Sequence, residues 1–184
     1  MKDKVIIYGG AFNPPTVAHE AIARVAAGYA YDNDADFWVL LSGERTDKSI
    51  CAPIEKRVQY GAALLASINT TVDTRVCTYE LERPLTQTAH TVEHLVKEHP
   101  ETEFTWLFGS DSIQTMPKWS GGEWLIKNLQ MLVVQRVGYE VELAENMTEL
   151  EAETPIVSST QVRQRLQRGE SVTGLVPEKV ISLL

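Results

Sequence analysis

The segment at residues 9–19 combines residue types that can hold phosphate. Gly9 and Gly10 carry no Cβ, so the backbone there can approach a ligand closely. Thr16 and His19 lie three residues apart where a helix is expected to begin, so their side chains can share one face. Because the first turn of a helix favours anions and His19 adds a donor, the segment predicts a phosphate site. The alternative is a tight turn with a helix N-cap and a surface histidine.

A second candidate phosphate site lies near the end of the chain. Ser158, Ser159 and Thr160 fall at an expected helix start, beside backbone N–H groups that have no partner within the helix. Arg163 lies one turn further on, where its guanidinium can bind phosphate through two parallel hydrogen bonds. The alternative is an ordinary N-cap followed by a solvated arginine.

Strands and helices are predicted to alternate along the chain. Short apolar runs predict strands at residues 5–8, 37–41, 72–77, 104–108 and 131–134. Apolar residues at helical spacing predict helices at residues 19–30, 53–65, 88–99, 122–128, 158–168 and 177–184. This order indicates an α/β fold, a doubly wound parallel sheet with helices on both faces.

The predicted sheet brings the candidate segments to one edge. In doubly wound sheets, ligands bind beyond the carboxyl ends of the strands. Residues 9–19 follow the first predicted strand, and residues 109–112, with the sequence Gly-Ser-Asp-Ser, follow the fourth. Residues 158–163 follow a short apolar run at residues 155–157, which is expected to be another strand end. The convergence of these segments predicts one ligand site at this edge.

The sequence also predicts which residues are buried. The second predicted helix is expected to bury one face, formed by Ile54, Val58, Ala62 and Leu65. The acidic stretch at residues 140–153 is expected to be a surface excursion. Cys51 and Cys77 make neither a CxxC site nor a disulfide framework, so buried thiols in a reducing cytoplasm are expected.

Charge and composition exclude some classes of partner. The chain has 184 residues and a formal net charge of -8, which argues against a broad surface for nucleic acid or an anionic membrane. A small anion can still bind to a few local cations and backbone N–H groups. Apolar runs are too short for a membrane span, and the four apolar residues after Met1–Lys4 are too few for a secretory leader.

The two phosphate segments carry a resemblance to a known superfamily. Thr16-Val17-Ala18-His19 and Ser158-Ser159-Thr160-Gln161-Val162-Arg163 resemble the (H/T)xGH and ISSTxxR motifs of nucleotidyltransferases. Within that superfamily, the sequence is most similar to the nicotinate/nicotinamide mononucleotide adenylyltransferases. It shares with them Gly109-Ser110-Asp111, Lys118-Trp119, the Thr88–Thr91 TxxT pattern, and a C-terminal segment that includes Leu175-Val176-Pro177.

The resemblance implies a Rossmann-like nucleotidyltransferase fold, with residues 1–184 as a single domain. It implies AMP transfer from ATP to nicotinate mononucleotide, or to nicotinamide mononucleotide, with release of pyrophosphate in NAD biosynthesis. ATP would be the co-substrate, and Mg²⁺ would be held through substrate phosphates, without a protein metal site. Small-molecule substrates are the implied partners, with no nucleic acid and no membrane, and a homo-oligomer stays open.

The resemblance also implies roles for individual residues. Catalytic phosphate contacts are implied for His19, Thr16 and Arg163. Nucleotide contacts are implied for Gly9, Gly10, Ala11, Phe12, Gly109, Asp111, Ser158, Ser159 and Thr160. Contacts with the pyridine mononucleotide are implied for Lys48, Thr88 and Trp119, with Trp119 as the stacking face. A partly buried core position is the alternative for Trp119, and Arg136 also resembles a family position.

Some residues depart from the family pattern. Thr16 stands where the family usually has histidine, Ala18 stands where it has glycine, and Arg45-Thr46-Asp47-Lys48 replaces its PPHK stretch. Pantetheine-phosphate adenylyltransferases also have threonine at the first of these positions. Phosphopantetheine as acceptor, a non-catalytic nucleotide-binding module and cytidylyl transfer are therefore alternatives, and the choice between acid and amide pyridine stays open.

Overall fold

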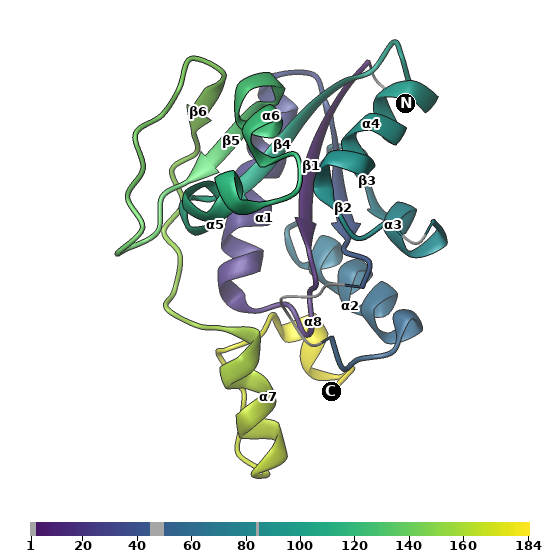
Figure 1. The fold of residues 1–184 in the computed structure, drawn as a ribbon. Helices are drawn as coiled ribbons and strands as arrows, with labels where there is room; N and C mark the ends of the chain where they lie inside the picture. The colour runs from purple at the N-terminus through teal and green to yellow at the C-terminus, as the bar shows by residue number, and fades with distance from the viewer. Residues whose placement is uncertain (1–2, 45–49, 84) are drawn as a thin grey trace.

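A computed structural model of the chain describes residues 3–44, 50–83 and 85–184. Within these ranges, six parallel strands form one sheet with the order β3-β2-β1-β4-β5-β6 (Figure 1). The strands are β1 (Lys4–Gly10), β2 (Asp36–Leu41), β3 (Thr74–Cys77), β4 (Glu103–Gly109), β5 (Gln130–Val134) and β6 (Met147–Glu149). The predicted doubly wound parallel sheet is confirmed.

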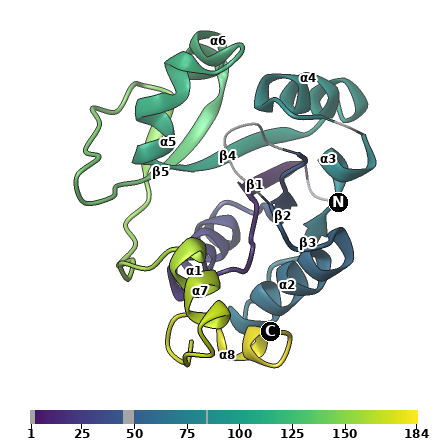
Figure 2. The ribbon, with the colours of Figure 1, turned by 60° about the horizontal axis from the view of Figure 1, so that its bottom comes forward.

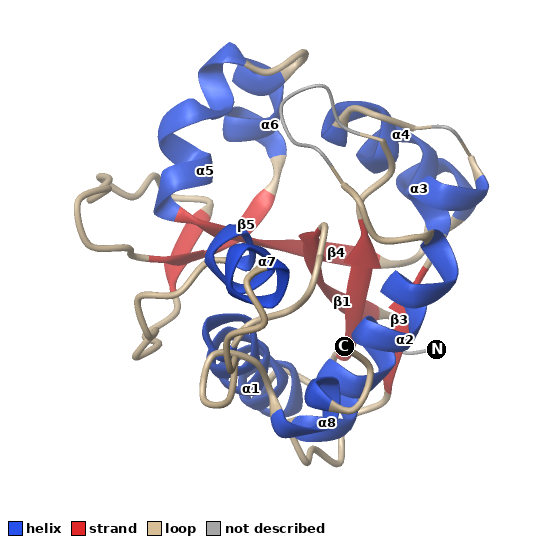
Figure 3. Ribbon diagram, turned by 90° about the horizontal axis from the view of Figure 1, so that it is seen from below, coloured by secondary structure: helices blue, strands red, loops and turns tan. Residues whose placement is uncertain are grey.

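Helices cover both faces of this sheet, as Figure 3 shows from below. One face packs on α1 (Val17–Asp32) and α2 (Ile54–Ser67). The other face packs on α3 (Tyr79–Glu82), α4 (Thr88–Glu98), α5 (Ser110–Thr115), the 3-10 helix η1 (Met116–Lys118) and α6 (Gly122–Asn128).

The central strands are buried on both faces, which explains their continuous apolar sequence. Successive side chains of a strand point to opposite faces. In β1, Ile6 and Tyr8 therefore join the core under α1, while Val5 and Ile7 join the core under α4. Burying side chains of this size contributes about 1.5–3 kcal/mol each.

The C-terminal part packs on α2 through a third, smaller cluster. The C-terminal part contains α7 (Ser159–Gln167) and α8 (Glu178–Ile181), which lie beside α1 and α2 at the lower end of the molecule (Figure 2). The cluster consists of Tyr60, Val162, Val172, Val176 and Val180. The Val17 N–H, at the start of α1, donates to the Leu175 carbonyl at 3.0 Å. The C-terminal segment thus holds the start of α1.

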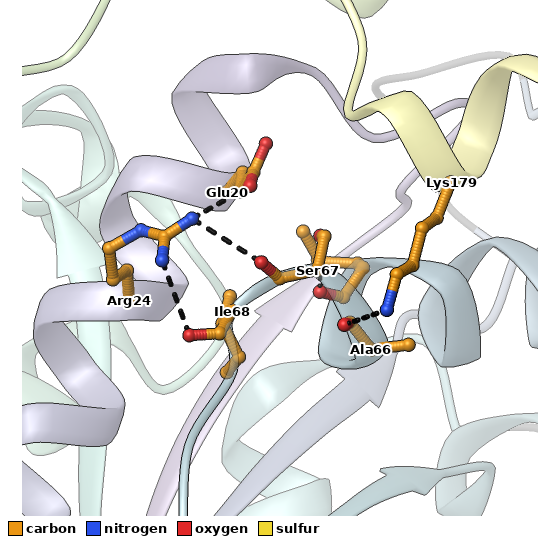
Figure 4. Close-up of polar contacts among 7 residues, drawn as sticks. Glu20, Arg24, Ala66, Ser67, Ile68 and Lys179 are labelled. Atoms are coloured by element: carbon orange, nitrogen blue, oxygen red, sulfur yellow. Dashed lines mark hydrogen bonds and ion pairs between the residues drawn. The ribbon is translucent and has the colours of Figure 1, made fainter.

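The carboxyl end of α2 is held by basic side chains from two other helices (Figure 4). Arg24 of α1 donates to the carbonyls of Ser67 and Ile68, each at 3.3 Å. Lys179 of α8 donates to the Ala66 carbonyl. Carbonyls at a helix end have no partner within the helix, and cations there also oppose the helix dipole.

The predicted buried face of α2 is confirmed only in part: Val58 and Leu65 are partly buried and pack against the core, but Ala62 is exposed. The buried positions are Arg57, Tyr60, Gly61 and Leu64. Ile54 is 51% exposed. Gly61 faces the sheet: a Cβ there would come within 3.1 Å of the Val76 side chain, so the missing side chain lets the helix approach the strand closely. Hydrophobic periodicity cannot identify a contact made by a glycine and an arginine.

Three further sequence expectations need correction. Residues 140–153 include the edge strand β6, which pairs with β5. Residues 155–157 form no strand, and Ile156 is 94% exposed because no neighbouring strand is available to it. Cys51 is exposed, whereas Cys77 is buried as predicted. In the part of the chain that the structure describes, no helix is long and apolar enough to cross a membrane.

Candidate active site

Two adjoining cavities open at the carboxyl edge of the sheet. The first has a volume of about 520 Å³ and is lined by all three segments that the sequence singled out. The second has a volume of about 370 Å³ and lies over the α4–α6 face. The residues that line both cavities are Gly9, Gly10, Ala11, Phe108, Asp111 and Ser112. Ligands in the two cavities would therefore meet along one wall.

His19 lines the first cavity from the first turn of α1. Its Nδ1 accepts a hydrogen bond from the Thr16 N–H at 3.0 Å, as part of a capping box. In the neutral ring this bond assigns the proton to Nε2. The ring also packs against Phe12, with centroids 5.4 Å apart. The imidazole is therefore held in one orientation, with Nε2–H as a donor.

Thr16 is fully buried and does not line either cavity. Its hydroxyl lies 2.8 Å from the Nδ1 atom of His19. The expectation that Thr16 contacts ATP phosphates therefore does not fit this structure. Because its side chain reaches His19 and not the cavity, Thr16 can act through the orientation of the imidazole.

The two segments that the sequence predicts to bind phosphate, residues 9–19 and 158–163, bind each other directly. Arg163 donates to the Asn13 carbonyl at 2.8 Å and to the Thr160 hydroxyl at 3.1 Å. The Ser159 hydroxyl donates to the Pro14 carbonyl at 2.8 Å. Ser158 is the N-cap of α7, and its hydroxyl accepts the Gln161 N–H. Together these bonds fix the loop before α1 against the start of α7.

Asp111 and Arg136 form an ion pair at the wall between the cavities. The Arg136 Nε lies 3.2 Å from an Asp111 carboxylate oxygen, and both side chains are partly exposed. The backbone N–H of Arg136 donates to the hydroxyl of the buried Ser110 at 2.8 Å. A Cβ on Gly109 would lie 2.4 Å from the Asp111 carboxylate and 2.6 Å from the Arg136 Nε. A side chain at position 109 would therefore force the Asp111 and Arg136 side chains to shift.

The second cavity has aromatic walls. Trp119 is partly buried and packs edge-on against Phe108, with centroids 6.2 Å apart. Thr88, at the start of α4, lines the same cavity, so the structure brings Thr88 and Trp119 together. Lys48, the third predicted contact, lies outside the residues that the structure describes.

Relatives of known description match most of this chain. Residues 7–165 match the family model described as cytidylyltransferase-like. A relative from Anaeromyxobacter dehalogenans, named "Probable nicotinate-nucleotide adenylyltransferase", is 33% identical, over 97% of this chain and 91% of its own length. Another of the same name, from Exiguobacterium sibiricum, is 30% identical, over 98% and 95%. The chain belongs to the nicotinate-nucleotide adenylyltransferase family.

The fold of this family member is also found in a solved structure. That structure is "Plasmodium falciparum nicotinic acid mononucleotide adenylyltransferase complexed with NaAD". It superposes with a TM-score of 0.81 at 20% identity, over 98% of this chain and 93% of that one. The resemblance inferred from the motifs is confirmed at the level of family and fold.

The sequence did not single out three lining or supporting residues of this family member. Arg57 is buried and binds the backbone beside the first cavity, while Glu80 and Tyr139 line the second. Burial lowers the pKa of Arg57 below its ordinary value, and the nearby Glu80 carboxylate opposes that shift. Burial also raises the pKa of Tyr8, a protonated hydroxyl that lines the first cavity. The one signal in the sequence that could have indicated a buried role for Arg57 was its charge within the apolar pattern of the helix predicted at residues 53–65.

Proposed function

We propose that the chain transfers AMP from ATP to nicotinate mononucleotide, with release of pyrophosphate, as a step of NAD biosynthesis. The observation that carries this proposal is the pair of cavities with a shared wall. The first combines His19, Arg136 and Arg163, which suit a polyphosphate. The second has aromatic walls that suit a planar ring. Such an arrangement can bring two bound substrates into contact, which lowers the barrier to their reaction.

The reaction needs no protein nucleophile. An oxygen of the mononucleotide phosphate attacks the α-phosphorus of ATP. A new P–O bond forms while the bond from the α-phosphorus to the oxygen bridging to the β-phosphorus breaks. Pyrophosphate leaves with the electron pair of that bond. Positioning and stabilisation of the phosphate charge therefore provide the catalysis.

His19 is proposed to donate from Nε2–H to an oxygen on the α-phosphorus. This role is supported by the bond from the Thr16 N–H to Nδ1, which leaves Nε2 as the protonated nitrogen. Negative charge grows on these oxygens during transfer, so a fixed donor stabilises the transition state. Thr16 is proposed as a positioning residue for His19 and not as a phosphate ligand.

Arg163 and the start of α7 are proposed to bind the β- and γ-phosphates that leave. A guanidinium has five N–H donors, and Arg163 already uses part of them on the Asn13 carbonyl and the Thr160 hydroxyl. The others, with Ser158, Ser159 and Thr160 along the cavity wall, provide donors for phosphate oxygens. Gly9, Gly10, Ala11, Phe12, Gly109 and Asp111 are proposed to contact the rest of the nucleotide.

The second cavity is proposed to take the pyridine mononucleotide. Trp119 would stack on the ring, and Thr88 would bind its carboxylate or amide. Lys48 is proposed to neutralise the acceptor phosphate, on its sequence position alone. Mg²⁺ would enter as MgATP, because Mg²⁺ prefers phosphate oxygens and water to an all-protein site. Asp111, the carboxylate that lines the first cavity, is already paired with Arg136.

A substrate panel tests this function. The protein is incubated with MgATP and, separately, nicotinate mononucleotide, nicotinamide mononucleotide or phosphopantetheine, and pyrophosphate release is measured. Release with nicotinate mononucleotide is expected, and the rate with nicotinamide mononucleotide decides between acid and amide. Release with phosphopantetheine alone would assign the pantetheine-phosphate reaction. ATP binding without any release would identify a non-catalytic module, and turnover with CTP would indicate cytidylyl transfer.

We also propose a cytoplasmic location and a single nucleotidyltransferase domain. The location is supported by the free thiols of Cys51 and Cys77. The domain is supported by the continuous sheet, which draws strands from residues 4 to 149. A homo-oligomer stays a proposal that light scattering would test.

A further inference from the structure

The carbonyl and the N–H of the peptide group between Ser42 and Gly43 bind side chains of opposite charge. The Arg57 Nη2 donates to the Ser42 carbonyl at 2.6 Å. The Gly43 N–H donates to a carboxylate oxygen of Glu80 at 2.8 Å. These are charge-assisted hydrogen bonds, which are stronger than neutral ones. Ser42, Gly43 and Arg57 are all buried, so water competes little for them.

This peptide is tied to the wall of the first cavity. The Ser42 N–H donates to the Gly10 carbonyl at 2.9 Å. The Arg57 Nε donates to the Ala11 carbonyl, also at 2.9 Å. Gly10 and Ala11 line both cavities. A shift of the Ser42–Gly43 peptide would therefore move the backbone along which the two substrates meet.

The same peptide is tied to the helix that lines the second cavity. The other carboxylate oxygen of Glu80 accepts the Thr91 hydroxyl at 2.8 Å. Thr91 is fully buried in α4, one turn after Thr88. Space around this network is limited, because a Cβ on Gly43 would lie 2.4 Å from the Leu85 carbonyl. The Thr91–Glu80–Gly43 chain of hydrogen bonds thus links the first turn of α4 to the peptide.

We propose that Arg57 and Glu80 are positioning residues that hold the two cavities in register through the Ser42–Gly43 peptide. The inference rests on the proposed function, because register matters where two bound phosphates must react. Arg57 acts on the nucleotide side through Ala11, and Glu80 acts on the pyridine side through Thr91. Displacements of about 1 Å can reduce turnover by about 10²-fold without any loss of a direct substrate contact.

The first test compares two variants at Thr91. Thr91→Val keeps the shape of the side chain but removes the donor to Glu80, whereas Thr91→Ser keeps the hydroxyl. Thr91→Val is expected to raise the KM for nicotinate mononucleotide about tenfold, in line with a lost hydrogen bond to a charged group, and to change the KM for ATP less than about twofold. Thr91→Ser is expected to restore wild-type constants. Equal kinetic constants for both variants and wild type would overturn the inference.

The second test is a double-mutant cycle between Arg57→Met and Glu80→Gln, with kcat/KM as the measured quantity. Because both side chains act on one peptide, the double variant is expected to match the more damaged single variant, at about a 10²-fold loss. Losses that multiply would show independent action and overturn the inference. Arg57→Lys, which keeps the charge, replaces Arg57→Met if the latter does not fold.

Controls separate this inference from simple stability and from the proposed function. Arg24→Met removes an arginine that also binds backbone carbonyls, at the other end of α2. It is expected to leave kcat and both KM values within about twofold. ATP affinity of each variant is also measured by calorimetry without acceptor. Absent turnover in wild type would refute the proposed function. With an active wild type, wild-type kcat/KM together with wild-type ATP affinity in Arg57→Met would refute the role of Arg57.

Discussion

An arginine side chain lies at each end of helix α2, and both arginines donate to backbone carbonyls. At the carboxyl end, Arg24 binds the Ser67 and Ile68 carbonyls, and its side chain is 54% exposed (Figure 4). At the amino end, Arg57 is 3% exposed and binds the Ala11 and Ser42 carbonyls. Both arginines thus donate to backbone carbonyls. The two carbonyls that accept from Arg57, however, belong to loops at the edge of the sheet where the cavities open.

The difference between the two ends separates stability from activity. Water can replace the exposed Arg24 side chain at the carbonyls it binds, so its loss should weaken packing only slightly. Water cannot easily replace Arg57, and the carbonyls that accept from it border the cavities proposed to hold the substrates. Variants at the edge of the sheet should therefore change kinetic constants, whereas variants at the far end of α2 should leave the kinetic constants unchanged and lower the free energy of unfolding only slightly.

The largest expected effect at the edge is that of His19→Ala. Turnover should fall by a factor of about 10² or more, because a donor to the transition state is lost. The free energy of unfolding should fall by only about 1 kcal/mol, since the capping box with Thr16 is lost. Steady-state kinetics and urea unfolding measure the two quantities. Unchanged turnover would contradict the role of His19 and the proposed division.

A smaller effect than that of His19→Ala is expected from one of two matched glycine substitutions, one beside the first cavity and one on α1. Gly109→Ala forces a Cβ against the Asp111–Arg136 pair, so the Kd for ATP should rise about tenfold, as expected for disturbed charge-assisted bonds. Gly28→Ala is the matched control, because nothing lies within 4 Å of its Cβ position on α1. It should raise the free energy of unfolding by about 0.5–1 kcal/mol. Equal ATP affinity in both variants would remove Asp111 and Arg136 from the nucleotide site.

Arg163→Ala tests the second arginine that lines the first cavity. The KM for ATP should rise about tenfold, because a charged hydrogen-bond donor contributes about 1.5–3 kcal/mol. The KM for the mononucleotide should change little. The measurement varies each substrate at saturating levels of the other. An effect confined to the mononucleotide would contradict the assignment of the first cavity to ATP.

The smallest effect is expected at the far end of α2. Arg24→Met should lower the free energy of unfolding by less than about 1 kcal/mol, since its partners are partly solvated carbonyls. Chemical unfolding measures this value. A larger loss of stability than in Arg57→Met would invert the comparison between the two ends of α2.

Much of the fold followed from local patterns. The predicted strands at residues 5–8, 37–41 and 104–108 lie within β1, β2 and β4, because buried parallel strands are continuous apolar runs. The helix predicted at residues 122–128 has the bounds of α6. The edge strand β6 was missed, since its three residues are mostly exposed and form no apolar run. The short helices α3 and α5 were missed because four to six residues give no period.

The candidate site was predictable in its segments but not in its contacts. Residues from the three segments 9–19, 109–112 and 158–163 do line one cavity. The first two follow strands whose ends meet at one edge of the parallel sheet, whereas hydrogen bonds to the loop before α1 hold the third. The roles of the predicted side chains stay predictions. The burial of Thr16 was not predictable, since it depends on a loop that Arg163 and Ser159 hold in place.

The sequence by itself determined the order of the longer strands and helices, the segments that meet at the first cavity and the family, because these depend on residue type and spacing along the chain. Only the tertiary structure decided which polar groups support them. The Ser42–Gly43 peptide is held by Arg57, Glu80 and, through Glu80, Thr91, from three separate helices. Hydrogen bonds of this kind require distances and directions that no local periodicity encodes.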